Sequence, residues 1–266
     1  MTQRQRFERF RELHGSGTFI IANPHDVGAA RILEALDFVA LATTSAGFAA
    51  SLGQLDMTVT RDQLVAHARS ICGATELPVN IDSERCYPGE PGGVTRTVEL
   101  LAEAGAAGCS IEDWNPLAKR IEPLDVAVSR VAEAAVAANR VGILLTARAE
   151  NHLRGVDDLD DTVERLRAYV AAGAHVVYAP GLVDRSRISR VVAETGAPVN
   201  VLLLPGGPTV AELTALGVRR ISLGSGLSNI AYGAFAKAAQ RLLAEGVLGT
   251  DEPVLPRALA SRAFTR

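Results

Sequence analysis

The chain of 266 residues has little cysteine, few aromatic side chains and no long apolar run. Its three cysteines, Cys72, Cys86 and Cys109, are too scattered for a disulfide framework, and no CxxC pair indicates a structural zinc site. No segment approaches the roughly 20 apolar residues of a membrane-spanning helix, and the first residues lack the apolar stretch of a signal peptide. We therefore expect a soluble, cytoplasmic protein with no membrane partner.

The charge pattern also excludes several classes of partner. There are 27 basic and 30 acidic residues, which give a net charge of -3, and no basic run is sustained. A nucleic-acid partner is not expected, because binding to phosphates requires a basic surface. Hydrophobic residues make up 48% of the chain but aromatic residues only 5%, so Ala, Val, Leu and Ile must form a core suited to helix-on-sheet packing.

Apolar strand patterns alternate with helical patterns along the whole chain. The helical patterns have Ala, Leu or Val at helical spacing, and several end at a glycine. Eight such strand–helix units predict a (β/α)8 TIM barrel, with an open doubly wound sheet as the alternative. We predict one domain, 1–266, with an N-terminal helix over 3–14 and a C-terminal helical extension. The predicted strands are 18–23, 38–44, 77–82, 106–113, 141–148, 174–180, 198–204 and 219–224. The predicted helices that follow them are 27–36, 60–72, 93–104, 123–139, 158–172, 184–194, 208–216 and 227–244.

Carboxylates gather after the second, third and fourth predicted strands. They are Asp56, Asp82, Glu84 and Glu112. In a parallel barrel the carboxyl ends of the strands meet on one face, so these groups would repel one another without a cation. Mg2+, or Mn2+ in the same oxygen-rich site, resolves the repulsion. The simpler interpretation is that each is a solvated loop residue.

Two further features follow predicted strands. Arg148 would either pair with Glu112 or Glu150, or bind an anionic group of a substrate. The small residues of "TTSAGFAASLG", 43–53, would form a turn whose backbone N–H groups can approach an anion, or they would only pack tightly. A cationic group opposite a metal ion favours an anionic small-molecule ligand.

The motifs "SAGFAASLGQLD", "PVNIDSERCYPG", "GCSIED", "TARAE" and "PVNVLLLPGGPTVAELTALGVRRISLG" occur in the order found in the isocitrate lyase and phosphoenolpyruvate mutase superfamily. The chain resembles this superfamily from about residue 18 to 240, including its phosphonomutase-like members related to carboxyvinyl-carboxyphosphonate phosphorylmutase. The resemblance implies a Mg2+-dependent barrel that makes or breaks a C–C or P–C bond next to an enolate. It also implies a homo-oligomer, a dimer or tetramer, with 227–244 as the exchanged segment.

The resemblance assigns roles to individual residues. Asp82 is implied as the direct metal ligand, with Glu84 in the same motif, while Asp56 and Glu112 are implied to act through water on the metal. Ser45, Ala46 and Gly47 match the turn that binds the substrate carboxylate. Arg148 matches the arginine that holds the substrate's anionic group, and Asn200 the asparagine of "PVNV". Tyr87 would transfer a proton near the enolate or only close the pocket.

Departures from the superfamily pattern bear on the substrate. The "KKCGH" loop of isocitrate lyases is absent, so isocitrate is not expected. The predicted lid, 114–123, is short, and Arg85 and Cys86 replace small residues, which is expected to narrow the site. The leading hypothesis is a lyase that cleaves a C–C bond of a small 2-oxo acid or its carboxylated precursor. The alternatives are a P–C phosphonomutase or phosphonopyruvate hydrolase, an oxaloacetate-type decarboxylase, and a non-catalytic carboxylate-binding barrel.

Overall fold

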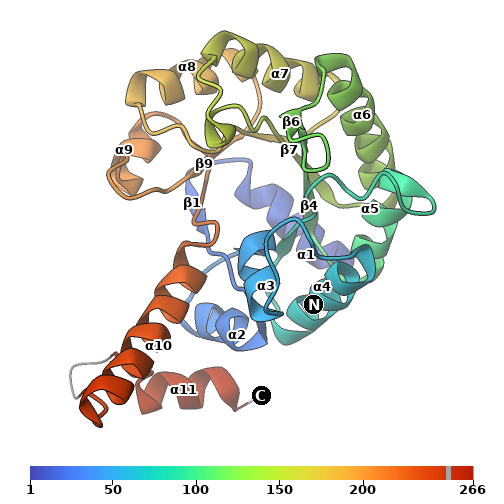
Figure 1. The fold of residues 1–266 in the computed structure, drawn as a ribbon. Helices are drawn as coiled ribbons and strands as arrows, with labels where there is room; N and C mark the ends of the chain where they lie inside the picture. The colour runs from blue at the N-terminus through green and yellow to red at the C-terminus, as the bar shows by residue number, and fades with distance from the viewer. Residues whose placement is uncertain (250–252, 266) are drawn as a thin grey trace.

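Eight parallel strands form the wall of a barrel in the computed structural model, which describes residues 1–249 and 253–265 (Figure 1). The strands are β1 (Phe19–Ile21), β2 (Leu41–Ala42), β3 (Val79–Asp82), β4 (Gly108–Glu112), β7 (Leu144–Arg148), β8 (Val176–Tyr178), β9 (Val199–Leu202) and β10 (Arg220–Ser222). They are hydrogen-bonded in the order β1-β10-β9-β8-β7-β4-β3-β2. The sheet closes where the Ala42 N–H donates to the Ala22 carbonyl at 3.0 Å. The predicted barrel is confirmed, and the open sheet is excluded.

Every predicted helix is present, and most of these helices cover the outside of the barrel. They are α1 (Gln3–Leu13), α2 (Val27–Ala35), α4 (Arg61–Ala74), α5 (Gly93–Glu103), α6 (Leu124–Val141), α7 (Leu159–Ala171), α8 (Arg185–Thr195), α9 (Val210–Ala215) and α10 (Gly226–Glu245). In the part of the chain described, none is long and apolar enough to cross a membrane.

Alternate residues of each barrel strand face opposite sides of the sheet. Ile81 and Leu145 lie in the apolar core between the sheet and the helices. Asn80 and Thr146, one position away, line a cavity inside the barrel. The interior of the barrel is therefore polar at the level where a ligand could enter.

Helix α1 closes the amino-terminal end of the barrel. A capping box at Thr2 starts the helix, and Phe10 on its inner face is fully buried. Phe10 contacts Phe19 edge to face, with 6.4 Å between the ring centroids, and shares an apolar cluster with Leu144. The cavity can therefore open only at the carboxyl ends of the strands.

Four short elements were not predicted as such. The small-residue turn is the helix α3 (Ser45–Ser51), capped by Thr44. The predicted lid is a two-stranded antiparallel hairpin of β5 (Trp114–Asn115) and β6 (Arg120–Ile121), and the 3-10 turn η1 (His152–Arg154) follows β7.

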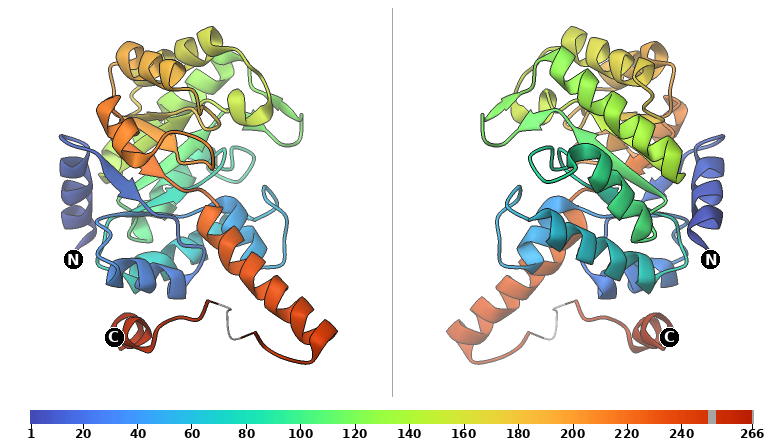
Figure 2. Two further views of the ribbon diagram at one scale, coloured as in Figure 1. Left: turned by 90° about the vertical axis from the view of Figure 1, so that its left-hand side faces the viewer. Right: turned by 90° about the vertical axis from the view of Figure 1, so that its right-hand side faces the viewer.

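The chain beyond the barrel was expected to be irregular or to form a short helix over a neighbouring subunit. The helix exists as α11 (Arg257–Phe264), but it lies against α2 of the same chain, where Ala263 is 3% exposed. Residues 250–252 and 266 of this predicted tail lie outside the described residues. Helix α10 instead extends away from the barrel (Figure 2).

Candidate active site

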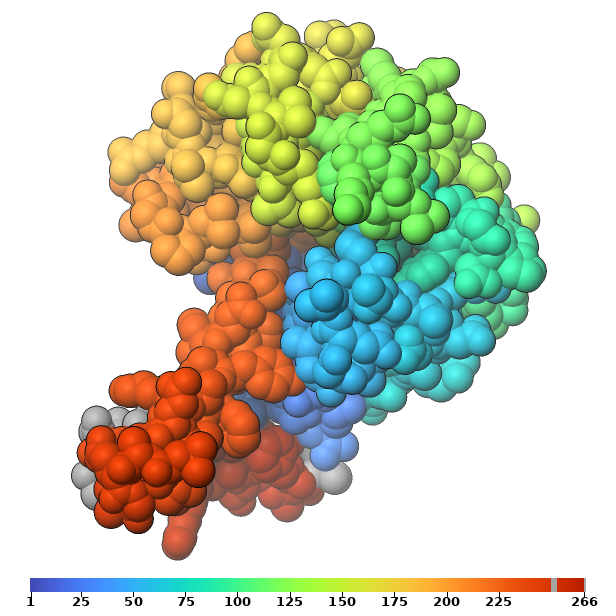
Figure 3. Space-filling view, in the orientation of Figure 1, coloured from blue at the N-terminus to red at the C-terminus, as the bar shows by residue number. Residues whose placement is uncertain are grey.

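A cavity of about 200 Å³ opens at the carboxyl ends of the strands. This volume is below the roughly 300–1,000 Å³ of pockets for drug-sized ligands, so it suits a small molecule. Figure 3 shows this face, with the light-blue segment around α3 on one side of the mouth and the green hairpin and η1 on the other. The polar residues that line the cavity are Asn23, Thr43, Thr44, Ser45, Asp56, Asn80, Asp82, Ser110, Thr146, Arg148, Tyr178, Asn200, Arg220, Ser222 and Ser225.

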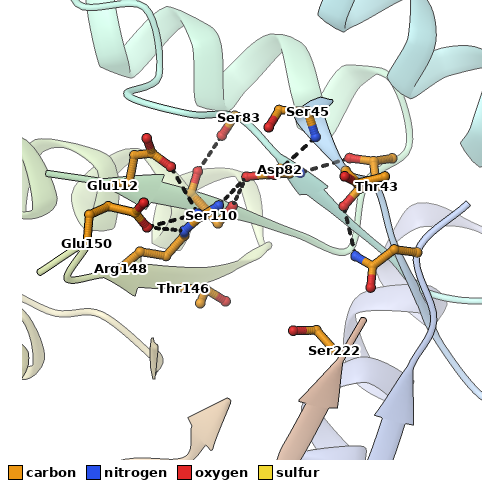
Figure 4. Close-up of polar contacts among 12 residues, drawn as sticks. Thr43, Ser45, Asp82, Ser83, Ser110, Glu112, Thr146, Arg148, Glu150 and Ser222 are labelled. Atoms are coloured by element: carbon orange, nitrogen blue, oxygen red, sulfur yellow. Dashed lines mark hydrogen bonds and ion pairs between the residues drawn. The ribbon is translucent and has the colours of Figure 1, made fainter. Parts of the chain in front are cut away.

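Asp82, the last residue of β3, lies at the centre of a polar network in the cavity (Figure 4). Its Oδ2 accepts the backbone N–H of Ser45 at 3.2 Å. Its Oδ1 accepts the Ser110 hydroxyl at 3.0 Å and Nη1 of Arg148 at 2.8 Å. Its own N–H donates to the Thr43 hydroxyl at 2.9 Å. Strands β4 and β7 and the start of α3 thus fix this carboxylate, and Thr43, directly after β2, holds its backbone.

Arg148 ends β7 and joins Asp82 to two more carboxylates. Its Nη2 lies 3.3 Å from Oε2 of Glu112 and 2.8 Å from Oε1 of Glu150, and its guanidinium lies 5.3 Å from the ring centre of Tyr178. Burial acts to lower the pKa of Arg148, but Glu150, Glu112 and Asp82 together raise it well above its usual value. The prediction that Arg148 pairs with Glu112 or Glu150 is confirmed for both residues. Its contact with an anionic group of a substrate remains a prediction.

Glu112 and Glu150 form a buried acidic pair behind Arg148. They are 4% and 0% exposed, and burial, followed by the charge of Glu150, raises the pKa of Glu112 well above its usual range. Oε1 of Glu112 and Oε2 of Glu150 accept no hydrogen bond, although Arg154 lies 3.9 and 3.6 Å away. Two buried acceptors are therefore left for a cation or water.

Glu84 lies beside Asp82 in a strained loop. Burial first, then the charges of Asp82 and Asp56, raise the pKa of Glu84 to about 8. Glu84, Cys86 and Tyr87 have positive φ angles of 49°, 54° and 47°, which L-residues adopt at a cost of about 1–2 kcal/mol each. Such strain is typical of functional loops.

The expected narrowing of the cavity by Arg85 and Cys86 is wrong. The left-handed turns of the loop direct both side chains away, and neither lines the cavity. Arg85 pairs with Glu122 at the base of the hairpin, and Cys86 is fully buried with its sulfur 3.2 Å from the Ser83 hydroxyl.

Two of the predicted substrate or proton-transfer residues lie outside the cavity. The Tyr87 hydroxyl donates to the Val59 carbonyl at 3.0 Å. The Gly47 N–H donates to the Thr44 hydroxyl at 3.3 Å, and a Cβ on Gly47 would lie 2.9 Å from the Ser228 hydroxyl of α10. Gly47 is therefore required for close packing. Ser45, Ala46, Asp56 and Asn200 line the cavity, whereas Glu84 and Glu112 are not among its lining residues.

Several cavity residues were missed because the prediction considered only the last residue of each strand and its loop. Ser110, Thr146 and Arg220 lie two positions before Glu112, Arg148 and Ser222, so they face the same interior. The period of two along a strand would have identified them. Tyr178 ends β8 and was overlooked because its strand ends without a charged residue.

The donor set restricts how a metal ion would be held. Within the described ranges, no group of three or more His, Cys, Asp or Glu side chains is close enough to form a protein-only metal site. Mg2+ keeps several waters and needs only one or two carboxylates. The oxygens of Glu112 and Glu150 that accept no hydrogen bond, and the raised pKa of Glu84, fit such a water-mediated cation site beside Asp82.

The family model of phosphoenolpyruvate phosphomutase matches residues 10–243. The chain belongs to the phosphoenolpyruvate mutase/isocitrate lyase superfamily. The resemblance inferred from the motifs is thereby confirmed. The superfamily contains C–C lyases that act on small carboxylates.

Solved structures of the superfamily match nearly the whole chain. A candidate lyase/mutase from Burkholderia cenocepacia J2315 has 44% identity and a TM-score of 0.93, over 99% of this chain and 97% of that one. A 2,3-dimethylmalate lyase has 27% identity and a TM-score of 0.85, over 100% and 95%. Oxaloacetate acetylhydrolase with the product oxalate has 27% identity and a TM-score of 0.87, over 98% and 94%.

Curated relatives have two named activities. A probable 2-methylisocitrate lyase 2 of Corynebacterium glutamicum is 30% identical over 214 residues, 77% of this chain and 66% of the relative. An oxaloacetate decarboxylase of Bradyrhizobium diazoefficiens is 30% identical over 217 residues, 78% of this chain and 73% of the relative. These names agree on carboxylate chemistry and differ on the substrate.

Proposed function

We propose that the protein is a Mg2+-dependent lyase that cleaves a C–C bond of a small 2-oxo acid, or of its carboxylated precursor, through an enolate. The observation that carries this proposal is Asp82, which is fixed by Ser45, Ser110 and Arg148 at the mouth of a small cavity. The carboxylates around it outnumber the guanidinium groups, which supports a cation at this position.

Asp82 would hold Mg2+ directly, while Asp56, Glu84 and Glu112 would act through water; Mn2+ fits the same donors. When bound, the ion supplies positive charge next to the oxygen at which enolate charge develops. Arg148 would then be free to bind an anionic substrate group, because the ion offsets part of the negative charge that Arg148 now balances together with the more distant Arg154.

Tyr178 is the phenol that this proposal uses for proton transfer. It lines the cavity, whereas Tyr87 does not. Burial raises the pKa of Tyr178 to about 12, so the phenol is protonated at neutral pH and can donate a proton to a carbanion-like carbon. Ser45 and Ala46 would position the substrate carboxylate at the start of α3.

The second candidate is an oxaloacetate-type decarboxylation. It is supported by the Bradyrhizobium relative, which matches 78% of this chain at 30% identity. Both reactions place negative charge on the same enolate oxygen, so the same residues serve both. They differ in the fragment that leaves.

A substrate panel tests the proposal. Purified protein with Mg2+ is given 2-methylisocitrate, 2,3-dimethylmalate, oxaloacetate and phosphonopyruvate, and products are measured as released 2-oxo acids and by phosphorus NMR. Cleavage of a branched malate or isocitrate supports the lyase, and turnover of oxaloacetate alone supports the second candidate. Turnover of phosphonopyruvate alone would identify P–C chemistry, and binding without turnover would identify a carboxylate-binding barrel; either result would overturn the proposal.

We also propose that the protein is a homo-oligomer, a dimer or tetramer, joined through α10. Only Ser228 of this helix is buried, while Ile230, Phe235 and Leu243 are 68%, 74% and 90% exposed. Apolar surface of this extent on a projecting helix indicates an interface. Ile230→Glu combined with Phe235→Glu should reduce the mass measured by light scattering to that of one chain, while Gln240→Glu should not. A wild-type protein of monomer mass would refute this.

A further inference from the structure

Arg220 places a buried positive charge at the floor of the cavity. It is the first residue of β10, is 3% exposed, and faces the barrel interior. Its Nε donates to Oδ1 of Asn200 at 2.9 Å, and its Nη2 donates to the Thr146 hydroxyl at 2.9 Å. Its Nη1 lies 3.4 Å from Nε2 of His14.

All three partners of Arg220 are neutral. Nδ1 of His14 lies 2.7 Å from the Phe10 carbonyl and must donate to it, so Nε2 is the acceptor that faces Arg220. Burial, followed by the charge of Arg220, lowers the pKa of His14 to about 3, so the ring is uncharged at neutral pH. Within residues 1–249 and 253–265, no carboxylate forms an ion pair with Arg220, in contrast to the three that surround Arg148.

A buried guanidinium without a counter-ion is costly, because its lost hydration is worth several kcal/mol. Burial lowers the pKa of Arg220 to about 9, which still leaves it charged at pH 7. The three described contacts use three of its five N–H groups. The fold thus maintains an uncompensated positive charge and spare donors at the wall of a cavity.

We propose that Arg220 binds a second anionic group of the substrate. The inference rests on the proposed function and narrows its substrate class to a 2-oxo acid that carries a further carboxylate or phosphonate. Asp82 and Arg220 line the same cavity from β3 and β10, which are three strands apart around the barrel. A substrate whose 2-oxo carboxylate lies near Asp82 therefore extends its other anionic end toward Arg220.

Arg220 also fixes the orientation of Asn200. Because Oδ1 of Asn200 accepts from Arg220, its Nδ2 must donate to the Ser222 hydroxyl, 2.9 Å away. Ser222 in turn lines the same cavity as Tyr178, close enough to lower the pKa of the phenol. Asn200 is thus a positioning residue that connects the cation of the floor to the phenol proposed for proton transfer.

This proposal is tested by comparing the affinities of ligands that have one anionic group with those of ligands that have two. Binding of pyruvate, 3,3-difluorooxaloacetate and phosphonopyruvate is measured by calorimetry in Mg2+ for wild type, Arg220→Met and Arg220→Lys. The control is Arg219→Met, which removes the neighbouring guanidinium that donates to the Gly17 carbonyl and does not line the cavity. We use the ratio of affinities within each folded variant, because this ratio does not depend on stability.

The wild type should bind at least one of the two longer ligands about tenfold or more tightly than pyruvate, the effect expected of a charge-assisted hydrogen bond. Arg220→Met should reduce this ratio to about one, while Arg220→Lys and Arg219→Met should retain most of it. Preference for difluorooxaloacetate identifies a carboxylate as the second group, and preference for phosphonopyruvate a phosphonate. An unchanged ratio in Arg220→Met overturns the inference and leaves the proposed function intact, whereas a wild type that binds none of the three ligands refutes the proposed function itself.

Discussion

Replacing Arg148 by Met removes the cation on which the acidic cluster depends. Arg148 is 12% exposed and contacts Asp82, Glu112 and Glu150 at 2.8, 3.3 and 2.8 Å. Methionine retains most of the apolar stem, so the change removes charge and hydrogen bonds rather than volume. Arg154 remains, but its nearest contacts to this pair are 3.6 and 3.9 Å.

Removing one partner of a buried ion pair costs about 3–5 kcal/mol. For a chain of this length, 1 kcal/mol lowers Tm by roughly 2–4 °C, so Arg148→Met should lose about 6–20 °C without Mg2+. The loss should depend on pH. The folded pKa of Glu112 already lies above its unfolded value, so its contribution to stability is complete below about pH 4.3 and is lost as pH rises through the folded pKa. Without Arg148 that pKa rises further, and the variant should be closer to wild type at pH 5 than at pH 8.

The assay is thermal and urea unfolding at pH 5 and pH 8 in the presence of a chelator. Arg190→Met is the matched control, because Arg190 is 40% exposed and pairs only with surface acids, Asp160 and Glu194, in the part of the chain described. Its substitution should cost less than about 1 kcal/mol. A loss for Arg148→Met no larger than for Arg190→Met, or a loss that is equal at both pH values, would show that Arg148 does not balance a buried acidic cluster.

Other substitutions test the remaining assignments. Asp82→Ala should abolish the rise in Tm that Mg2+ and oxalate give the wild type, while substitution of the exposed Asp62 in the first turn of α4, Asp62→Ala, should preserve it; retention of the rise in Asp82→Ala would contradict the ligand assignment. Without metal, wild-type stability should fall as pH rises from about 4.5 to about 8, because the folded pKa of Glu84 is raised, and Glu84→Gln should flatten this slope in urea titrations. Gly47→Ala should lose about 1–3 kcal/mol, because its Cβ would lie 2.6 Å from a Thr44 methyl group. Gly73→Ala, with nothing within 4 Å, should gain about 0.5–1 kcal/mol; equal effects would refute the packing role of Gly47.

The barrel was predictable from the sequence because its strands are continuous apolar runs and its helices have regular apolar spacing. Both patterns show which side chains are buried, and burial determines where the strands and helices pack. The hairpin at 114–121 was not predicted, because each of its strands has two residues and two residues show no periodicity. Helix α3 was missed for a related reason: it has only seven residues, six of them small, and they show no clear apolar spacing.

The site was predictable where chemistry coincides with the end of a strand. Asp82 and Arg148 end β3 and β7, and the structure joins them at 2.8 Å. Tyr87 was misplaced because a positive φ at three residues of its loop reverses the direction of the side chains, and the sequence contains no glycine there to signal it. Arg220 was missed because it begins its strand, two residues below the rim.

These positions together make the cavity electrostatically asymmetric. Carboxyl groups outnumber guanidinium groups around Asp82, whereas the floor has the positive charge of Arg220 and no paired acid in the part of the chain described. Thr146, Asn200 and His14 hold Arg220 in place, on a strand three positions from that of Asp82 around the barrel. The acidic cluster around Asp82 and the guanidinium of Arg220 therefore lie apart within one small cavity. A bound cation would compensate the carboxylates, and the second anionic end of a ligand would compensate Arg220.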